Sequence, residues 1–194
     1  MYVRAARNRD ELWLLDRIEE LDLDEAAFRS RDYVIAVDEE TGEKGGFGRL
    51  RLHKAEDDEE FCELTSIGVL PGWRGQGVGA HVVERLVENA GDEGFSEVYA
   101  FVESGEPYEE LGFVRIEEDD LPGPLADRLE EKRGQVAPEA VPMRLSVGSF
   151  TMPARHREAF KAAGSGAEEA EIEETAEDFG IDPDKATYKY DTGR

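Results

Sequence analysis

The sequence contains little cysteine, histidine or lysine and has no long hydrophobic run. Its one cysteine, Cys62, excludes an internal disulfide and a cysteine-cluster metal site. Its three histidines, His53, His81 and His156, lack the spacing of metal ligands. The apolar runs are too short to cross a bilayer, and the first twenty residues lack the apolar block of a secretory signal. We therefore expect a soluble, cytoplasmic protein without a metal or a membrane partner.

Positive charge is also scarce. The chain has 47 Asp and Glu against 23 Lys and Arg, a formal net charge of −24, and only six of the basic residues are lysine. Nucleic-acid binding needs a basic face, so we expect no nucleic-acid partner. Repulsion among these negative charges should destabilise the fold in dilute buffer. In molar salt the Debye length falls to about 3 Å, and this repulsion should largely vanish. The composition resembles that of cytoplasmic proteins from salt-accumulating halophiles; an acidic mesophilic protein with a disordered tail is the alternative.

The pattern of apolar residues separates an α/β domain, residues 1–150, from an acidic extension, residues 151–194. Hairpin-like strands come first and strands alternating with helices come later, which indicates a mixed α/β sheet. We expect strands at residues 2–5, 33–37, 47–53, 61–70, 97–102, 113–116 and 141–147. Helices are expected from a cap at Asn8 or Asp10 to Leu21, and at residues 25–30, 77–90, 107–111 and 125–133.

Two of these helices carry an apolar face at helical spacing. In the first helix the expected buried residues are Leu12, Leu15, Ile18 and Leu21. In the helix over residues 77–90 they are Val78, Val82, Val83, Leu86, Val87 and Ala90.

The extension differs from the domain in composition. The Gly-Ser-Gly run at residues 164–166 predicts a flexible joint, and residues 167–184 contain nine acidic and no basic residues. Ile172, Ala176 and Phe179 lie at helical spacing within this stretch, which indicates a helix with a thin apolar edge. We expect the extension to be partly helical or disordered, and we favour docking or a partner contact over full disorder.

A glycine-rich turn follows the strand over residues 61–70, and residues 61–80 read FCELTSIGVLPGWRGQGVGA. Glycines let the backbone approach an anion, and free N–H groups at a helix N-terminus favour its negative charge. Arg74 can add charge-assisted hydrogen bonds. The turn has neither the Gly-Lys-Ser/Thr ending of a P-loop nor the acidic ribose partner of a dinucleotide fold. It therefore indicates a diphosphate cradle of another kind, and turn geometry alone is the alternative.

Two motifs resemble one family. The run Val69-x-Pro71-x-Trp73-Arg74-Gly75-Gln76-Gly77-Val78-Gly79 is similar to the acetyl-CoA signature of the GCN5-related N-acetyltransferases (GNAT), in which an Arg/Gln-x-x-Gly-x-Gly/Ala pattern binds the cofactor diphosphate. The run Tyr108-Glu109-Glu110-Leu111-Gly112-Phe113 is similar to the family's Tyr-Glu-Lys-Leu-Gly-Phe element. The resemblance covers residues 1–117, and it extends to residue 148 by topology. It implies a mixed central sheet that splays after the fourth strand, with helices on both faces.

The resemblance also implies a cofactor, acetyl-CoA, and a site for it. Its binding residues would be Ile67, Val69, Leu70, Arg74, Gly75, Gln76, Gly77, Val78, Gly79 and Ala80. The backbone N–H of Ile67 or Val69 would polarise the thioester carbonyl. An amine held in the same cleft would then attack that carbonyl directly.

The attacking amine must be neutral, and this requires a base. Deprotonation at pH 7 costs roughly 4.6 kcal/mol for a lysine-type amine and roughly 1.4 kcal/mol for an α-amine of pKa near 8. Glu63 is the first candidate base and Glu103 the second; a solvated strand carboxylate is the alternative for Glu63. Tyr108 would protonate the departing thiolate, unless it only packs beneath the sheet. Cys62 is expected to be a small core residue.

The chain departs from the family pattern before Tyr108. Many members have an asparagine that contacts the cofactor, and residues 102–107 contain none, so Ser104 or backbone groups must substitute. Pro107 replaces the usual apolar residue beside the tyrosine.

A weaker resemblance points to the acetyltransferase domain of N-acetylglutamate synthases. It rests on Cys62-Glu63 and on residues 111–113 followed by Asp119-Asp120-Leu121-Pro122. A dicarboxylate substrate would need arginines near the cleft. Those available are Arg49, Arg51, Arg115, Arg128 and Arg144.

Together these observations predict an acetyl-CoA-dependent N-acetyltransferase that acts on a small-molecule amine or an amino acid. Two alternatives stay open: a protein or peptide N-acetyltransferase, and a non-catalytic acetyl-CoA-binding protein whose tail engages a partner. Dimers are frequent in the family, so a homodimer is among the partners to expect.

Overall fold

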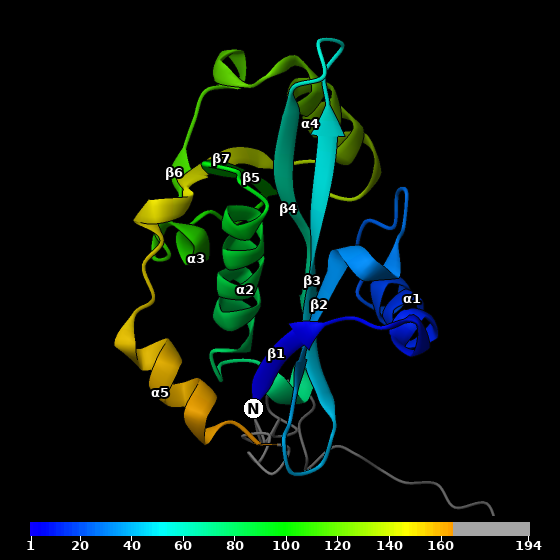
Figure 1. The fold of residues 1–194 in the computed structure, drawn as a ribbon, viewed down its shortest axis with the longest axis vertical. Coiled ribbons are helices and arrows are strands. Elements are labelled where there is room, and N and C mark those ends of the chain that lie inside the picture. Colours follow the sequence, from blue (N-terminus) through cyan, green and yellow to red (C-terminus); the bar gives the residue numbers. More distant parts are fainter. Residues whose placement is uncertain (165–194) are drawn as a thin grey trace, which may run out of the picture.

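One twisted sheet runs through residues 1–164, the part of the chain described by the computed structural model (Figure 1). Its strand order is β1-β2-β3-β4-β5-β7-β6, and all neighbours are antiparallel except β4 and β5. The strands are β1 (Tyr2–Ala5), β2 (Tyr33–Val37), β3 (Lys44–Lys54), β4 (Glu60–Val69), β5 (Glu97–Val102), β6 (Val114–Arg115) and β7 (Val141–Ser146). The expected mixed sheet is therefore confirmed.

Helices cover both faces of this sheet. They are α1 (Glu11–Glu20), α2 (Val78–Asp92), α3 (Glu106–Glu109), α4 (Gly123–Gln135) and α5 (Ala154–Ala162). Figure 1 shows α2, α3 and α5 on one face, and α1 and α4 on the other. Three apolar clusters match this division, one beneath α2, one beneath α4 and one beneath α1.

The apolar face predicted for α2 is confirmed. Its six residues are each at most 3% exposed. Glycines in β3 let this helix approach the sheet closely, because a Cβ at Gly48 would lie 2.7 Å from Val82 Cγ1. The position of α2 matters for function, since its N-terminus follows the glycine-rich turn.

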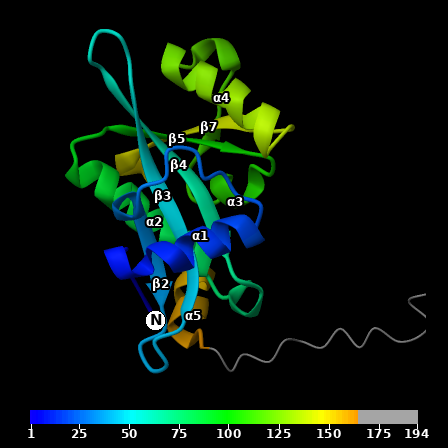
Figure 2. The same ribbon diagram turned by 90° about the vertical axis from the view of Figure 1, so that its right-hand side faces the viewer.

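The face predicted for α1 is confirmed at Ile18 and Leu21, which belong to or pack against the apolar cluster beneath the helix, and it is wrong at Leu12. Leu14 and Ile18 are fully buried, whereas Leu12 is 71% exposed. Leu14 and Ile18 are four residues apart and therefore share one side of the helix, which packs on Tyr33 and Phe47. Figure 2 shows α1 lying across the strands on this face.

The helix expected over residues 25–30 is also wrong. The chain makes turns there and then a short 3₁₀ helix, Ser30–Asp32. The side chain of Asp24 accepts the N–H of Ala26 (2.8 Å), a local bond that competes with a helix. The carbonyls of Ala26 and Ala27 accept hydrogen bonds from the guanidinium of Arg49. Groups that a helix would pair internally are thus used by a buried side chain.

The beginning of the extension packs against the domain. α5 lies along α2, and the ring of its Phe160 stacks on His81 with centroids 3.8 Å apart. The helix predicted around Ile172, Ala176 and Phe179 lies outside the described residues. Within residues 1–164, each helix is too short or too polar to cross a membrane.

Candidate active site

The sheet opens between β4 and β5. These strands pair only at Glu63 with Tyr99 and at Leu64 with Ala100, although β4 continues to Val69. Ser66 adopts a left-handed backbone conformation (φ 48°), and the β3–β4 register shifts there. A bulge of this kind bends a strand and increases its twist. β4 therefore leaves β5 at Thr65, as the predicted splay requires.

Beyond this point one edge of β4 lacks a partner strand among the described residues. The N–H of Leu70 donates to Gly45 O on the β3 side (2.9 Å). Backbone groups alternate in direction along a strand, so the N–H groups of Ile67 and Val69 face the opened side. These are the two N–H groups that the family resemblance implies as hydrogen-bond donors to the thioester oxygen.

The glycine-rich turn links β4 to α2. Gly75 (φ 72°) and Gly77 (φ 73°) have left-handed conformations that favour glycine. Within the described chain no side chain caps α2, so the first helical N–H groups face the turn without a capping acceptor. The exposed Arg74 is tethered by its Nε to Val69 O (3.3 Å). A Cβ at Gly75 would meet open space. These features fit a diphosphate. Gly77, in contrast, is covered by the backbone of His156 in α5.

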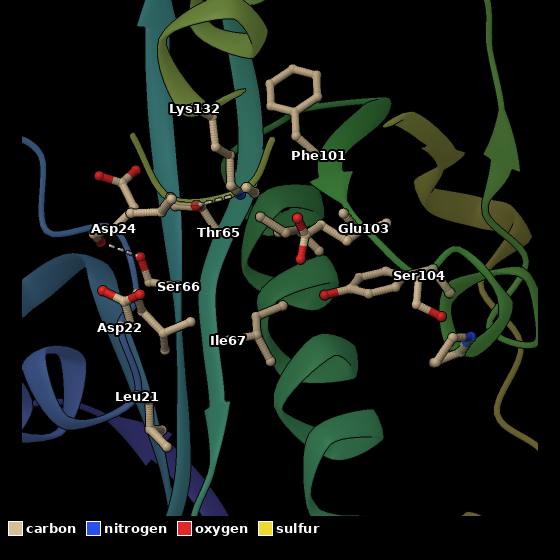
Figure 3. Close-up of a pocket in the computed structure, with 17 residues that line it drawn as sticks. Leu21, Asp22, Asp24, Thr65, Ser66, Ile67, Phe101, Glu103, Ser104 and Lys132 are labelled. Carbon is tan, nitrogen blue, oxygen red and sulfur yellow. Dashed lines mark hydrogen bonds between the residues drawn. The ribbon is translucent and has the colours of Figure 1, made fainter. Parts of the chain in front are cut away.

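A cleft of about 550 Å³ occupies the opening of the sheet (Figure 3). Its walls come from the α1–β2 loop, β4, the end of β5, α3 and the C-terminal part of α4. Figure 3 shows Asp22 and Asp24 on the α1–β2 side and Glu103 on the β5 side, with Lys132 reaching down from α4 to Thr65. The cleft thus brings carboxylates and one ammonium to the edge of β4.

Tyr108 is common to this cleft and to a smaller cavity of about 190 Å³ between α2 and α3. Its ring makes an edge-to-face contact with Phe113 at 5.4 Å. Burial raises the pKa of its phenol to about 12, so the phenol is protonated at neutral pH. Tyr108 therefore lies where a proton donor is expected, and its role as an acid stays a prediction.

Glu63 lies on the face of β4 toward α4 and is fully buried. Its Oε2 accepts hydrogen bonds from Arg128 Nε (3.1 Å) and His53 Nε2 (2.7 Å). Its Oε1 lies 3.8 Å from Lys132 Nζ. The alternative of a solvated carboxylate is therefore wrong. Glu63 does not line the cleft, whereas the exposed Glu103 does.

The five arginines considered for a dicarboxylate do not line the cleft either. Arg128 is buried among carboxylates, with Nη2 on Asp24, Nη1 on Glu131 and Nε on Glu63. Arg49 is held by two carbonyls and Asp32. The charges of these two side chains are already used within the fold.

Lys132 is the cation that the sequence analysis missed. It is 9% exposed, and its Nζ donates to Thr65 Oγ1 (3.2 Å). Burial lowers its pKa, and the nearby Glu63 opposes that shift. A signal was present, because Lys132 follows Leu125, Arg128 and Leu129 at helical spacing and so shares the buried face of α4.

The profile of the Acetyltransferase (GNAT) family matches residues 3–113, more than half of the chain. The chain belongs to this GNAT family. It is an acetyl-CoA-dependent N-acetyltransferase, as the two sequence motifs implied. A sequence comparison with curated proteins gives no significant match.

Solved structures of low identity share the GNAT fold of this acetyltransferase. Rv2747 from Mycobacterium tuberculosis, in complex with CoA and NLQ, has a TM-score of 0.61 at 19% identity, over 75% of this chain and 99% of that one. N-acetylglutamate synthase from Neisseria gonorrhoeae, complexed with coenzyme A and N-acetyl-glutamate, has a TM-score of 0.59 at 21% identity. The match covers 75% of this chain and 34% of that one. Arabidopsis thaliana Naa50 with a CoA-peptide bisubstrate analogue has a TM-score of 0.51 at 15% identity. The match covers 74% of this chain and 97% of that one. These neighbours include both amino-acid and peptide acetyltransferases.

Proposed function

We propose that this acetyltransferase acetylates the amine of a small molecule that carries a carboxylate, such as a free α-amino acid. The observation that carries this proposal is Lys132, the one cation among the described residues that line the cleft. An ammonium group has three N–H donors. The hydroxyl of Thr65 accepts one of them, and the Oε1 of Glu63 lies 3.8 Å from Nζ, beyond hydrogen-bond distance. A carboxylate in the cleft is the natural acceptor for a second.

The amine of such an acceptor has its own partners. Asp22 and Glu103 are exposed carboxylates of the cleft wall, and they favour the approach of an ammonium group. Glu103 is our choice for the base, because it reaches the cleft and Glu63 does not. An α-amine needs only modest help from such a carboxylate, since its deprotonation costs roughly 1.4 kcal/mol at pH 7.

Acetyl-CoA supplies the acetyl group as an activated thioester. On this chain, Arg74 and the N–H groups of the glycine-rich turn would hold the diphosphate, and the N–H of Ile67 or Val69 would donate to the thioester oxygen. Tyr108 would donate a hydrogen bond to the leaving sulfur. Glu103 would take the amine proton, and the C–S bond would break as the C–N bond forms. Tyr108 would pass its phenolic proton to the departing sulfur, which would leave as the thiol, and the tyrosine would regain a proton from solvent.

The test compares acceptors that differ in one group. Initial rates are measured with free amino acids, with their carboxamides and with short peptides. We expect kcat/KM to be at least tenfold higher for the acids than for the amides. Lys132→Met should remove this preference by raising KM for the acids. Lys54→Met, at an exposed position on the β3–β4 hairpin, is the matched control and should change nothing.

Two results would overturn this assignment. Faster turnover of peptides than of free amino acids would favour a peptide N-acetyltransferase. Binding of acetyl-CoA without turnover of any amine would favour a non-catalytic acetyl-CoA-binding protein.

A further inference from the structure

We propose that α5 is a displaceable strap, which covers the cofactor groove and must move before the diphosphate of CoA can settle at Gly77. The proposal rests on the assignment of the glycine-rich turn as the diphosphate site. It concerns the regulation of that site and is independent of which amine is acetylated.

The first observation is the contact between α5 and Gly77. A Cβ built on Gly77 would lie 2.3 Å from the backbone oxygen of His156. A glycine in such a turn serves to let a ligand approach the backbone. Here the chain's own backbone has made that approach. At Gly72 and Gly75 the same construction meets open space, so the obstruction lies at the end of the turn, where α2 begins.

The second observation is the way α5 bridges two helices. Arg155 and His156 at its start contact Glu110 beside α3. Arg157 binds Glu84 of α2 with Nη2 2.7 Å from Oε1. The small cavity of about 190 Å³ lies between these attachments, and its lining combines β4, α2 and α3 with His156. This cavity joins the opened edge of β4 to the first turn of α2, and an extended cofactor bound at both places would have to pass along it.

The contacts that hold α5 are of a kind that can be broken. The arginines of its two ion pairs are 59% and 49% exposed, and exposed pairs contribute little because water and salt screen them. A helix of nine residues is not stable by itself. Phe160 is the main apolar anchor, 8% exposed and stacked on His81. Phe160 is thus the buried residue of α5, and Met152 and Ala163 beside its ends pack partly on the same apolar cluster. On our proposal the cofactor competes with this attachment.

Competition has a defined consequence for affinity. If only the fraction of molecules with α5 displaced binds CoA, the observed Kd exceeds the intrinsic Kd by the inverse of that fraction. A change that loosens α5 without touching the turn should therefore tighten CoA binding. An α5 that forms part of the binding site would give the opposite sign.

Phe160→Ala in the full chain loosens α5 without changing its charge. Calorimetric titration with CoA in molar KCl should show Kd at least fivefold lower than for the wild type. Phe95→Ala is the matched control, because Phe95 packs against the same apolar cluster and lies at the other end of α2. Its Kd should equal that of the wild type. A Kd for Phe160→Ala that is unchanged or higher would overturn the strap.

Hydrogen exchange of the wild-type protein provides a readout that needs no variant. With saturating CoA, the amides of residues 154–162 should exchange faster, while those of α2 stay protected. Unchanged or slower exchange in α5 with CoA bound would overturn the strap and leave the diphosphate site intact. Absence of CoA binding to both wild type and Phe160→Ala would overturn the diphosphate assignment, and the strap with it.

Discussion

The ammonium of Lys132 donates a hydrogen bond to the hydroxyl of Thr65 across 3.2 Å, and this contact joins α4 to β4 where β4 and β5 separate. Thr65 is the first residue of β4 beyond the last pair with β5. The position of the ammonium is therefore set by the same point of the sheet that opens the cleft. Because α4 lies on the face opposite α2, our proposal expects the acceptor and the cofactor to reach the split from different sides.

Tyr108→Phe tests the donor to the leaving group. We expect kcat to fall about 10²-fold or more, as is usual when a proton donor is removed. The ring remains to pack against Phe113, so the thermal midpoint and the Kd for CoA should not change. Steady-state kinetics and calorimetry check this. An unaltered kcat would show that solvent protonates the sulfur.

Glu103→Gln and Glu63→Gln separate a base from a buried ion pair. Glu103→Gln should lower kcat about 10²-fold with little loss of stability, because Glu103 is exposed. Glu63→Gln should lower the free energy of unfolding by about 3 kcal/mol, because it removes one charge partner of the buried Arg128. Urea titrations and kinetics measure both. The reverse pattern would assign the base role to Glu63.

Asp10→Asn tests a buried carboxylate at the start of α1. Its side chain accepts hydrogen bonds from Arg4 and from the N–H of Arg7, and it pairs with Lys44. The hydrogen bond from Arg4 is the largest cause of the lowered pKa of Asp10. A lowered folded-state pKa stabilises the fold above the unfolded value of about 3.9, and this contribution is lost as the pH falls below it.

At pH 7 the Asp10→Asn variant should therefore lose about 2 kcal/mol. The difference from the wild type should shrink as the pH falls below about 4. Urea unfolding across this pH range checks the sign. Asp16→Asn, at an exposed position on α1, should have no measurable effect. A loss that is the same at every pH would contradict the assigned charge effect.

Arg74→Ala tests the diphosphate site under conditions in which the surface charge is screened. In dilute buffer an acidic surface repels the polyanionic cofactor, and molar KCl shortens the Debye length to about 3 Å. CoA at about 100 times its Kd should stabilise the wild type by about 2.7 kcal/mol in that salt. Arg74→Ala should lose most of this thermal shift. Arg85→Ala, on the surface of α2, should keep it.

The parts of the site that depend on local sequence were predictable. The glycine-rich turn after Pro71, the position of Arg74 in it and the start of the following helix could all be predicted, because each depends only on neighbouring residues. The bulge at Ser66 was not, because a serine with positive φ is held there by the Asp24 carbonyl from a distant loop (2.6 Å). Long-range contacts of this kind leave no local pattern.

The same limit applies to the charged residues. Arg49 and Arg128 are of the residue type expected to bind a dicarboxylate. Apart from Glu131, three residues from Arg128, their partners lie 17 to 104 residues away in the sequence. Lys132 lies on the buried face of α4, and its spacing of three residues from Leu129 could have predicted this. The contact of α5 with Gly77 joins residues 79 positions apart, numbers 77 and 156, and no periodicity indicates it.

The parallel junction between β4 and β5 consists of two residue pairs, and it has a mechanical consequence. The strands on its two sides form separate antiparallel ribbons, which meet along a seam only two residues long. A ligand that hydrogen-bonds to both β4 and β5 beyond these two pairs would link the two ribbons as an additional strand would. We therefore expect the sheet to be stiffer when the cofactor is bound, and the two ribbons to twist more independently when it is absent.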